Sequence, residues 1–222
     1  MNKRLNILVA NDDGIASPGL LRLANAAARL GDVWVAAPAG QCSGMSQKIT
    51  IAGEISVEKR NFPADVKAAY AIGGTPADCV KTAIKSLLPV KPDVVFSGIN
   101  SGFNTGFDIA YSGTVAAAME AVMNGIPAIA FSAQHDGSYD VTDRYILDIA
   151  RELLAAGQSR LVRYTMGGES SDTGMICGGA ICLCYLHLDA TQAPLFQEIV
   201  DVLAYRRIGD FVIDFEPFIA SA

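Results

Sequence analysis

Two adjacent carboxylates follow a short apolar run near the start of the chain. Asn11-Asp12-Asp13-Gly14 comes directly after residues 6–10, which the sequence predicts to form a β-strand. Where a strand ends and the chain turns, both carboxylates can converge on one point, and unpaired they repel each other. A hard divalent cation such as Mg²⁺ or Mn²⁺ removes that repulsion and prefers oxygen ligands. The alternative interpretation is that Asp-Asp-Gly only forms a turn.

A second polar loop follows the next predicted strand, residues 33–37. Residues 38–46 offer hydroxyl groups and backbone amides, and Ser43 could supply a neutral oxygen to a cation. Ser-Gly is also a common turn sequence, so this loop by itself does not decide between the two interpretations.

The strongest candidate stretch is residues 97–115. It interleaves glycines, which allow close backbone approach to a ligand, with asparagines, which add side-chain carbonyls and amide donors. These residues are Gly98, Asn100, Gly102, Asn104 and Gly106. The composition indicates a cradle for an anion and a metal. The spacing of the glycines matches neither the G-x-G-x-x-G turn of dinucleotide-binding proteins nor a Walker motif with its lysine. The sequence therefore disfavours a binding site for a nucleotide cofactor.

Ser112-Gly113-Thr114 opens a predicted helix at the end of this stretch. The first turn of a helix has free backbone N–H groups and the positive end of the helix dipole, so a phosphate could bind there. An ordinary serine N-cap without any ligand is the alternative.

Short apolar runs alternate with helical patterns over roughly the first 155 residues. The predicted strands are residues 6–10, 33–37, 49–59, 69–72, 94–96 and 128–131, and the predicted helices are residues 18–30, 75–88, 112–123 and 141–156. Apolar strands separated by crossover helices indicate a doubly wound, mostly parallel, Rossmann-like α/β sheet covered on both faces. Such sheets bind ligands beyond the carboxyl ends of their strands, where all three polar segments lie.

Composition excludes several classes of protein. Half of the 222 residues (51%) are apolar and 18% are charged, which excludes intrinsic disorder. The 17 basic and 23 acidic residues give a net charge of −6, which argues against binding to duplex nucleic acid or to an anionic membrane. The five cysteines are odd in number and lack the spacing of a disulfide framework. Together with the absence of a signal-peptide pattern, they predict a cytoplasmic location.

Over about residues 5–132 the chain resembles the SurE family of metal-dependent survival-protein phosphatases, the 5′/3′-nucleotidases. The resemblance rests on the Asn-Asp-Asp-Gly turn, the 37–50 loop, residues 74–80, residues 97–115 and Gly125-Ile126-Pro127-Ala128. It implies hydrolysis of nucleoside monophosphates with Mg²⁺ or Mn²⁺, one ion per subunit. The implied metal ligands are Asp12, Asp13, Ser43 and Asn100, with Asp12, Asp13 and Asn100 also catalytic. Asn11, Ser112, Gly113 and Thr114 are the implied phosphate site.

The C-terminal part departs from that family pattern. A polar, glycine-rich stretch at 167–174 leads to the apolar run 175–186, a predicted helix at 195–206 and a short predicted strand at 211–215. Cys177-Gly178-Gly179 faintly resembles a segment of XdhC-type accessory proteins. We therefore expect a SurE-like phosphatase domain at 1–158 and an atypical α+β segment at 159–222. Two alternatives follow: a non-catalytic metal- and phosphate-binding remnant, or an XdhC-like maturation factor. The resemblance also allows a homo-oligomer.

Overall fold

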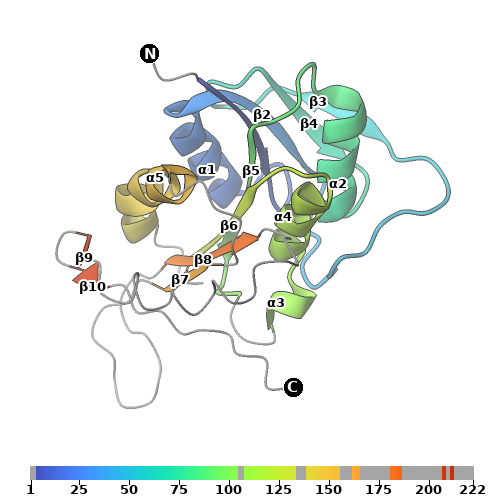
Figure 1. The fold of residues 1–222 in the computed structure, drawn as a ribbon. Coiled ribbons are helices and arrows are strands. Elements are labelled where there is room, and N and C mark those ends of the chain that lie inside the picture. Colours follow the sequence, from blue (N-terminus) through green and yellow to red (C-terminus); the bar gives the residue numbers. More distant parts are fainter. Residues whose placement is uncertain are drawn as a thin grey trace.

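The computed structural model describes residues 4–104, 108–133, 139–155, 162–165, 181–186, 207–208 and 211–212. Its centre is an eight-stranded sheet with the order β3-β4-β2-β1-β5-β6-β8-β7 (Figure 1). The parallel strands are β1 (Leu5–Ala10), β2 (Gly31–Pro38), β4 (Ala68–Ile72), β5 (Val94–Ser101) and β6 (Ala128–Ala133). The strands β3 (Val57–Arg60), β7 (Val162–Thr165) and β8 (Ile181–Leu186) each run antiparallel to a neighbour. The predicted doubly wound, mostly parallel sheet is confirmed.

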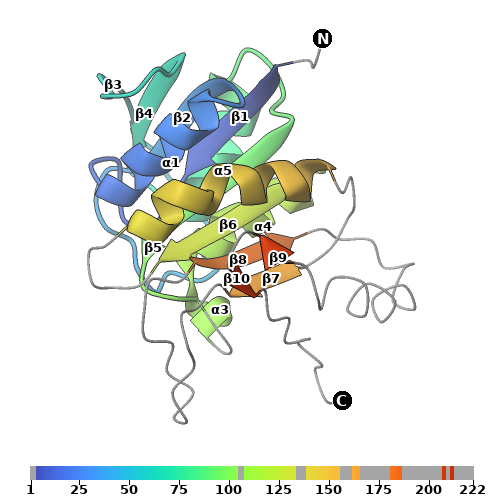
Figure 2. The ribbon, with the colours of Figure 1, turned by 90° about the vertical axis from the view of Figure 1, so that its left-hand side faces the viewer.

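Helices cover both faces of the sheet (Figures 1 and 2). The helices α1 (Pro18–Ala28) and α5 (Asp140–Ala155) pack on one face, and α2 (Pro76–Thr82) and α4 (Gly113–Met123) pack on the other. Because side chains alternate along a strand, Ile7 and Val9 of β1 belong to the first core, and Leu8 and Ala10 belong to the second. Burial on both faces explains why this strand is apolar along almost its whole length.

Two smaller helical elements complete this part of the chain. A π-helix (Ala83–Leu87) directly continues α2, and the single turn α3 (Asp108–Tyr111) precedes α4. The sequence pattern predicted one continuous helix over 75–88. The structure confirms a helical segment there, formed by α2 and the π-helix together. The pattern did not predict α3.

The predicted strand at 49–59 is wrong for its first part. Only Val57–Arg60 forms a strand, at the edge of the sheet, and its four residues are exposed. Gly53, with φ of +97°, interrupts the extended backbone, and Ile51 is 92% exposed. The alternation of apolar residues therefore does not reflect a buried face here.

The strand β5 extends further than its apolar run predicts. The pattern ends at Phe96, yet the strand continues to Ser101 after a shift of register between Ser97 and Asn100. At Gly98, with φ of +135°, an added Cβ would lie 2.3 Å from the Phe131 carbonyl oxygen. Only glycine permits this approach, which lets β5 carry polar residues to the sheet edge.

The last part of the described chain continues the same sheet. The strand β8 pairs with β6, and β7 pairs with β8. The short strands β9 (Arg207–Ile208) and β10 (Phe211–Val212) pair with each other, and β10 overlaps the strand expected at 211–215. The helix expected at 195–206 and the Cys-Gly-Gly segment lie outside the described residues, and the boundary near residue 158 stays a prediction. None of the helices in the described ranges has the length and apolar character needed to cross a membrane.

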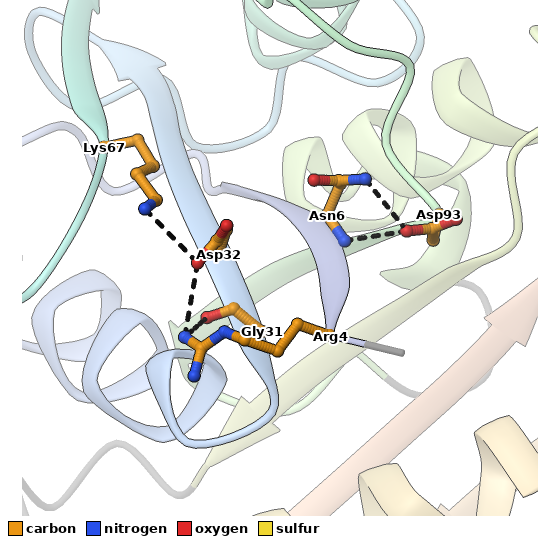
Figure 3. Close-up of polar contacts among 6 residues, drawn as sticks. All are labelled: Arg4, Asn6, Gly31, Asp32, Lys67 and Asp93. Carbon is orange, nitrogen blue, oxygen red and sulfur yellow. Dashed lines mark hydrogen bonds and ion pairs between the residues drawn. The ribbon is translucent and has the colours of Figure 1, made fainter. Parts of the chain in front are cut away.

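Polar contacts tie the strands together at the amino edge of the sheet (Figure 3). Asp32 on β2 forms ion pairs with Arg4 at 3.3 Å and with Lys67 at 3.4 Å. Asp93, just before β5, accepts hydrogen bonds from the backbone and side chain of Asn6 at 2.8 and 3.2 Å. Exposed ion pairs contribute little to stability, so their effect is mainly on position. They hold β1 in register between β2 and β5, and the carboxyl ends of these strands meet at the opposite edge.

Candidate functional site

The Asn11–Gly14 turn at the carboxyl end of β1 is held by the Asn11 side chain. Its amide nitrogen donates to the Gly14 carbonyl at 3.1 Å and to the Ser17 hydroxyl at 2.8 Å, and its amide oxygen accepts from the Gly14 N–H at 3.2 Å. Ser17 also caps α1 by accepting from the Leu20 N–H. Asn11 therefore shapes the loop that presents Asp12 and Asp13.

Asp12 lies against the first turn of α4. Its side chain is buried, and its carboxylate accepts a hydrogen bond from the fully buried Thr114 hydroxyl. Gly113 makes this approach possible, because a Cβ there would lie 2.7 Å from the Asp12 Cβ and 2.9 Å from its Oδ2. The structure thus brings together residues that the sequence separates by about one hundred positions.

Asp13 contacts the end of β5 instead. Its Oδ2 accepts a hydrogen bond from the Ser101 backbone N–H at 3.2 Å. The neighbouring Asn100 donates from its amide nitrogen to the Gly102 carbonyl at 2.8 Å. This bond uses the nitrogen of the Asn100 amide and leaves its carbonyl oxygen as the group suited to a cation.

The loop that carries Ser43 is attached to the same turn. The Cys42 N–H donates to the Asp12 carbonyl at 2.7 Å, and the exposed Ser43 is the next residue. Further along the loop, the Ser46 N–H donates to the Tyr111 carbonyl at 3.0 Å. Both contacts hold the loop at the carboxyl edge of the sheet, as the sequence predicted.

Asp78 anchors the far end of this loop. Thr75 and Asp78 form the expected capping box of α2, and Asp78 is 1% exposed. Its carboxylate also accepts from the Thr50 N–H at 2.9 Å and from the Thr50 hydroxyl at 2.7 Å. Burial raises the pKa of Asp78, but hydrogen bonds from Thr50 and Thr75 outweigh it, so the pKa lies below its ordinary value. Sequence reasoning assigned Asp78 to capping alone and did not predict this second role.

The two edges of the sheet differ in their electrostatics. Whereas Asp32 at the amino edge is paired with two cations (Figure 3), no basic side chain of the described chain forms an ion pair with Asp12 or Asp13. Burial raises the pKa of Asp12, the hydrogen bond from Thr114 lowers it, and the charge of Asp13 raises it again, with a net rise. Negative charge is therefore concentrated at the carboxyl edge and partly desolvated there.

The first turn of α4 lies beside these carboxylates. Ser112 caps the helix by accepting from the Val115 N–H at 3.1 Å, and the Thr114 carbonyl accepts from the Ser97 hydroxyl at 2.7 Å. With the Thr114 hydroxyl bonded to Asp12, both hydroxyls of the Ser-Gly-Thr motif have a structural partner. The Val115 N–H is bonded to Ser112 and the Thr114 N–H to the Asp12 carboxylate, so the Gly113 N–H and the positive end of the helix dipole are what this first turn offers to an anion.

The donor set fits a hard cation. Within the described ranges no three His, Cys, Asp or Glu side chains come together, so a zinc-type cluster is not found there. Two carboxylates without a cationic partner, an amide oxygen and a hydroxyl on adjoining loops are instead oxygen ligands of the kind that Mg²⁺ and Mn²⁺ prefer.

A cleft of about 580 Å³ opens on the side of Asp13 that faces α1 and the start of α5. Its wall includes Ser17, Arg22, Gln41, Ser101 and Tyr139. Sequence reasoning did not predict Arg22 or Tyr139 as site residues. No local motif marks them, because Arg22 lies on α1 and Tyr139 directly precedes α5, and only the packing of these two helices brings them to this edge.

Comparisons with known proteins agree on one family. The model of a family described as "Survival protein SurE" matches residues 7–172. The chain is 39% identical over 175 residues to the 5′-nucleotidase SurE of Pelotomaculum thermopropionicum, covering 78% of this chain and 66% of that protein. It is 44% identical over 146 residues to the 5′-nucleotidase SurE 1 of Chlamydia caviae, covering 64% of this chain and 52% of that protein.

A solved structure is also similar. The crystal structure of the SurE protein from Aquifex aeolicus is 28% identical, with a TM-score of 0.65, and the match covers 89% of this chain and 99% of that one. Against the curated relatives, the chain spans about half to two thirds of their length.

Proposed function

The chain belongs to the SurE family, and we propose that it is a metal-dependent phosphomonoesterase that hydrolyses nucleoside monophosphates to nucleoside and phosphate. The observation that carries the proposal is the contact of Asp12 with the first turn of α4, with Asp13 next to it on the end of β5, at one edge of the sheet. Two carboxylates suited to a cation then lie beside a helix N-terminus suited to an anion, the combination that phosphoryl transfer uses. The name 5′-nucleotidase carried by the relatives supports the same reaction.

Four side chains would hold the cation: Asp12, Asp13, Ser43 and Asn100. When bound, Mg²⁺ or Mn²⁺ would polarise the phosphate ester, offset the developing charge and lower the pKa of a coordinated water. The chain's own contribution is to hold Asp12 through Thr114 and Asp13 through the Ser101 N–H before any ligand arrives. Such preorganisation reduces the reorganisation needed during the reaction.

Residues 112–114 would bind the phosphate through the first turn of α4. Asn11 would act at the phosphate site by shaping the Asp-bearing turn. A water then attacks phosphorus in line with the ester oxygen and gives a proton to Asp12 or Asp13, while the P–O bond to the nucleoside breaks. The departing nucleoside oxygen takes up a proton from solvent, so the products are the nucleoside and inorganic phosphate. A covalent route, in which one carboxylate attacks first and forms an aspartyl-phosphate, is the alternative, and trapping a phosphorylated aspartate during turnover would establish it.

The remaining expectations are parts of the same proposal. We place the reaction in the cytoplasm, where the free thiols of Cys42 and Cys79 would stay reduced. A nucleoside monophosphate is the proposed substrate, and neither duplex nucleic acid nor a membrane is a proposed partner. The family resemblance allows a homo-oligomer, and solution scattering on the purified chain measures the oligomeric state.

Phosphate release from a panel of nucleoside monophosphates, with and without Mn²⁺, tests the proposal. We expect Mn²⁺-dependent release that Asp12→Asn removes, because this change takes a ligand charge from the site and not from the core. The matched control is Asp32→Asn at the opposite edge, where the carboxylate has two basic partners. A folded protein that binds Mn²⁺ but releases no phosphate would favour the non-catalytic remnant, and full activity of Asp12→Asn would refute the metal assignment.

A further inference from the structure

The cleft beside Asp13 has no role in the reaction steps described above. At about 580 Å³ it falls within the size range of small-molecule sites. Its wall combines the apolar side chains of Ile15 and Pro18 with the polar side chains of Gln41 and Arg22. A mixed lining of this kind suits a ligand with flat apolar faces and polar edges.

Arg22 is held in this wall by two contacts. Its guanidinium lies over the Tyr139 ring, 4.8 Å from the ring centroid, and forms an ion pair with Asp143. The two contacts come from the first turn of α5 and the residue before it, whereas Arg22 lies on α1. Together they fix both the position and the plane of the guanidinium, while the side chain stays 43% exposed.

The charges of the cleft argue against a polyanionic ligand. Among the described lining residues Arg22 is the only basic one, and Asp143 already offsets its charge. Asp13, which also lines the cleft, adds a negative charge. A chain of phosphates would therefore find no net positive charge, whereas an uncharged leaving group would meet no electrostatic penalty.

We propose that this cleft binds the nucleoside leaving group of the substrate, and that the Arg22 guanidinium, backed by Tyr139, is the surface on which the base stacks. The inference rests on the proposed function, because Asp13 connects the cleft to the reacting phosphate. Guanidinium planes stack on nucleobases, and every base offers such a face. Arg22 is then a specificity-determining residue, and Tyr139 and Asp143 are positioning residues that act through it.

Steady-state kinetics with two substrates test this role. With adenosine monophosphate we expect Arg22→Met to lower kcat/KM about tenfold, mainly through KM, because base stacking is lost. With glycerol 2-phosphate, which has no base, we expect no change. Arg22→Lys keeps the charge but loses the plane, so it should behave like Arg22→Met if stacking is what matters. Thermal unfolding of each variant checks that it is folded.

A gain of function provides a second test. Asp143→Asn leaves the Arg22 charge without its partner, so we expect adenosine 3′,5′-bisphosphate to gain in kcat/KM relative to adenosine monophosphate by about threefold to tenfold. Equal changes for both substrates would contradict the assigned role of Asp143. Equilibrium dialysis of adenosine with the wild type and with Arg22→Met measures nucleoside affinity without any catalysis. We expect the variant to bind adenosine more weakly.

The outcomes separate the inference from the proposed function. No hydrolysis of either substrate by the wild type would refute the proposed function, and dialysis would still decide whether the cleft binds a nucleoside. Hydrolysis of both substrates, with equal losses for them in Arg22→Met or with adenosine binding unaffected, would refute the cleft assignment alone.

Discussion

Replacing Thr114 by valine removes one hydrogen bond at the centre of the proposed site and almost nothing else. The Thr114 hydroxyl donates to the Asp12 carboxylate, and both side chains are buried. Valine has nearly the same shape, so the first turn of α4 should keep its packing. The Asp12 carboxylate, which has no basic partner in the described chain, would lose its side-chain donor.

The size of the effect follows from that burial. A hydrogen bond to a charged group contributes about 1.5–3 kcal/mol. Burial already raises the pKa of Asp12, and Thr114 opposes that rise, so the pKa should rise further in the variant. If the same energy holds the carboxylate ready for a cation, Mn²⁺ affinity at pH 7 should fall by about 10-fold to 150-fold. Isothermal titration calorimetry with Mn²⁺ measures this directly, and phosphate release should fall in parallel.

Thr114→Ser is the matched control for this variant. It keeps the hydroxyl and removes only a methyl group, so we expect Mn²⁺ affinity close to that of the wild type. The acidic limb of the pH–rate profile should move to higher pH in Thr114→Val and stay in place in Thr114→Ser. Equal Mn²⁺ affinity in the two variants would refute the reasoning, because it would mean that this hydrogen bond does not prepare Asp12 for the metal.

Three further results are expected. Gly113→Ala would place a methyl group 2.7 Å from the Asp12 Cβ, forcing a displacement of about 1 Å, so kcat/KM should fall about 100-fold in a protein that still unfolds cooperatively; unchanged kinetics would contradict the close contact. The lowered pKa of Asp78, held by Thr50 and Thr75, stabilises the fold above the unfolded-state pKa of about 3.9, and this stabilisation disappears as the pH falls through the folded-state pKa. Asp78→Asn should therefore lower Tm at pH 7, and the Tm of the variant should fall less than that of the wild type between about pH 5 and 3. Parallel curves of Tm against pH would refute this. Chelation by EDTA should stop phosphate release reversibly and leave the far-ultraviolet circular dichroism unchanged, since the sheet core contains no proposed ligand; loss of helix signal would instead indicate a structural metal.

The apolar strands and capped helices could be recognised from the sequence because their signals are local. Residues 7–10 are apolar because β1 is covered on both faces, and Thr75 with Asp78 marks the start of α2 through contacts only three residues apart. The first part of the strand expected at 49–59 was wrong for the opposite reason. Its alternating pattern resembles a half-buried strand, but Gly53 has a positive φ and, in the described part of the chain, only Val57–Arg60 pairs with a neighbouring strand.

Asp78 shows how one residue can be recognised for one role and missed for another. Its capping contact to Thr75 spans three positions, whereas its contact to Thr50 spans 28. No periodicity or turn rule connects residues at that separation, so the anchoring of the Ser43 loop could not be read from the chain alone. The same holds for Arg22 and Tyr139, which face each other only because α1 and α5 pack on the same side of the sheet.

The sequence by itself determined the class of fold, the edge of the sheet where polar groups collect, and the residue types available there. Those properties depend on hydrophobic periodicity and on turn chemistry, which act over a few residues. Only the tertiary structure decided that Asp12 contacts Thr114 and Gly113 and that the Ser101 N–H donates to Asp13. It also decided that Arg22 lines a cleft beside them. These contacts arise from the order of strands in the sheet, which brings distant segments together at one edge.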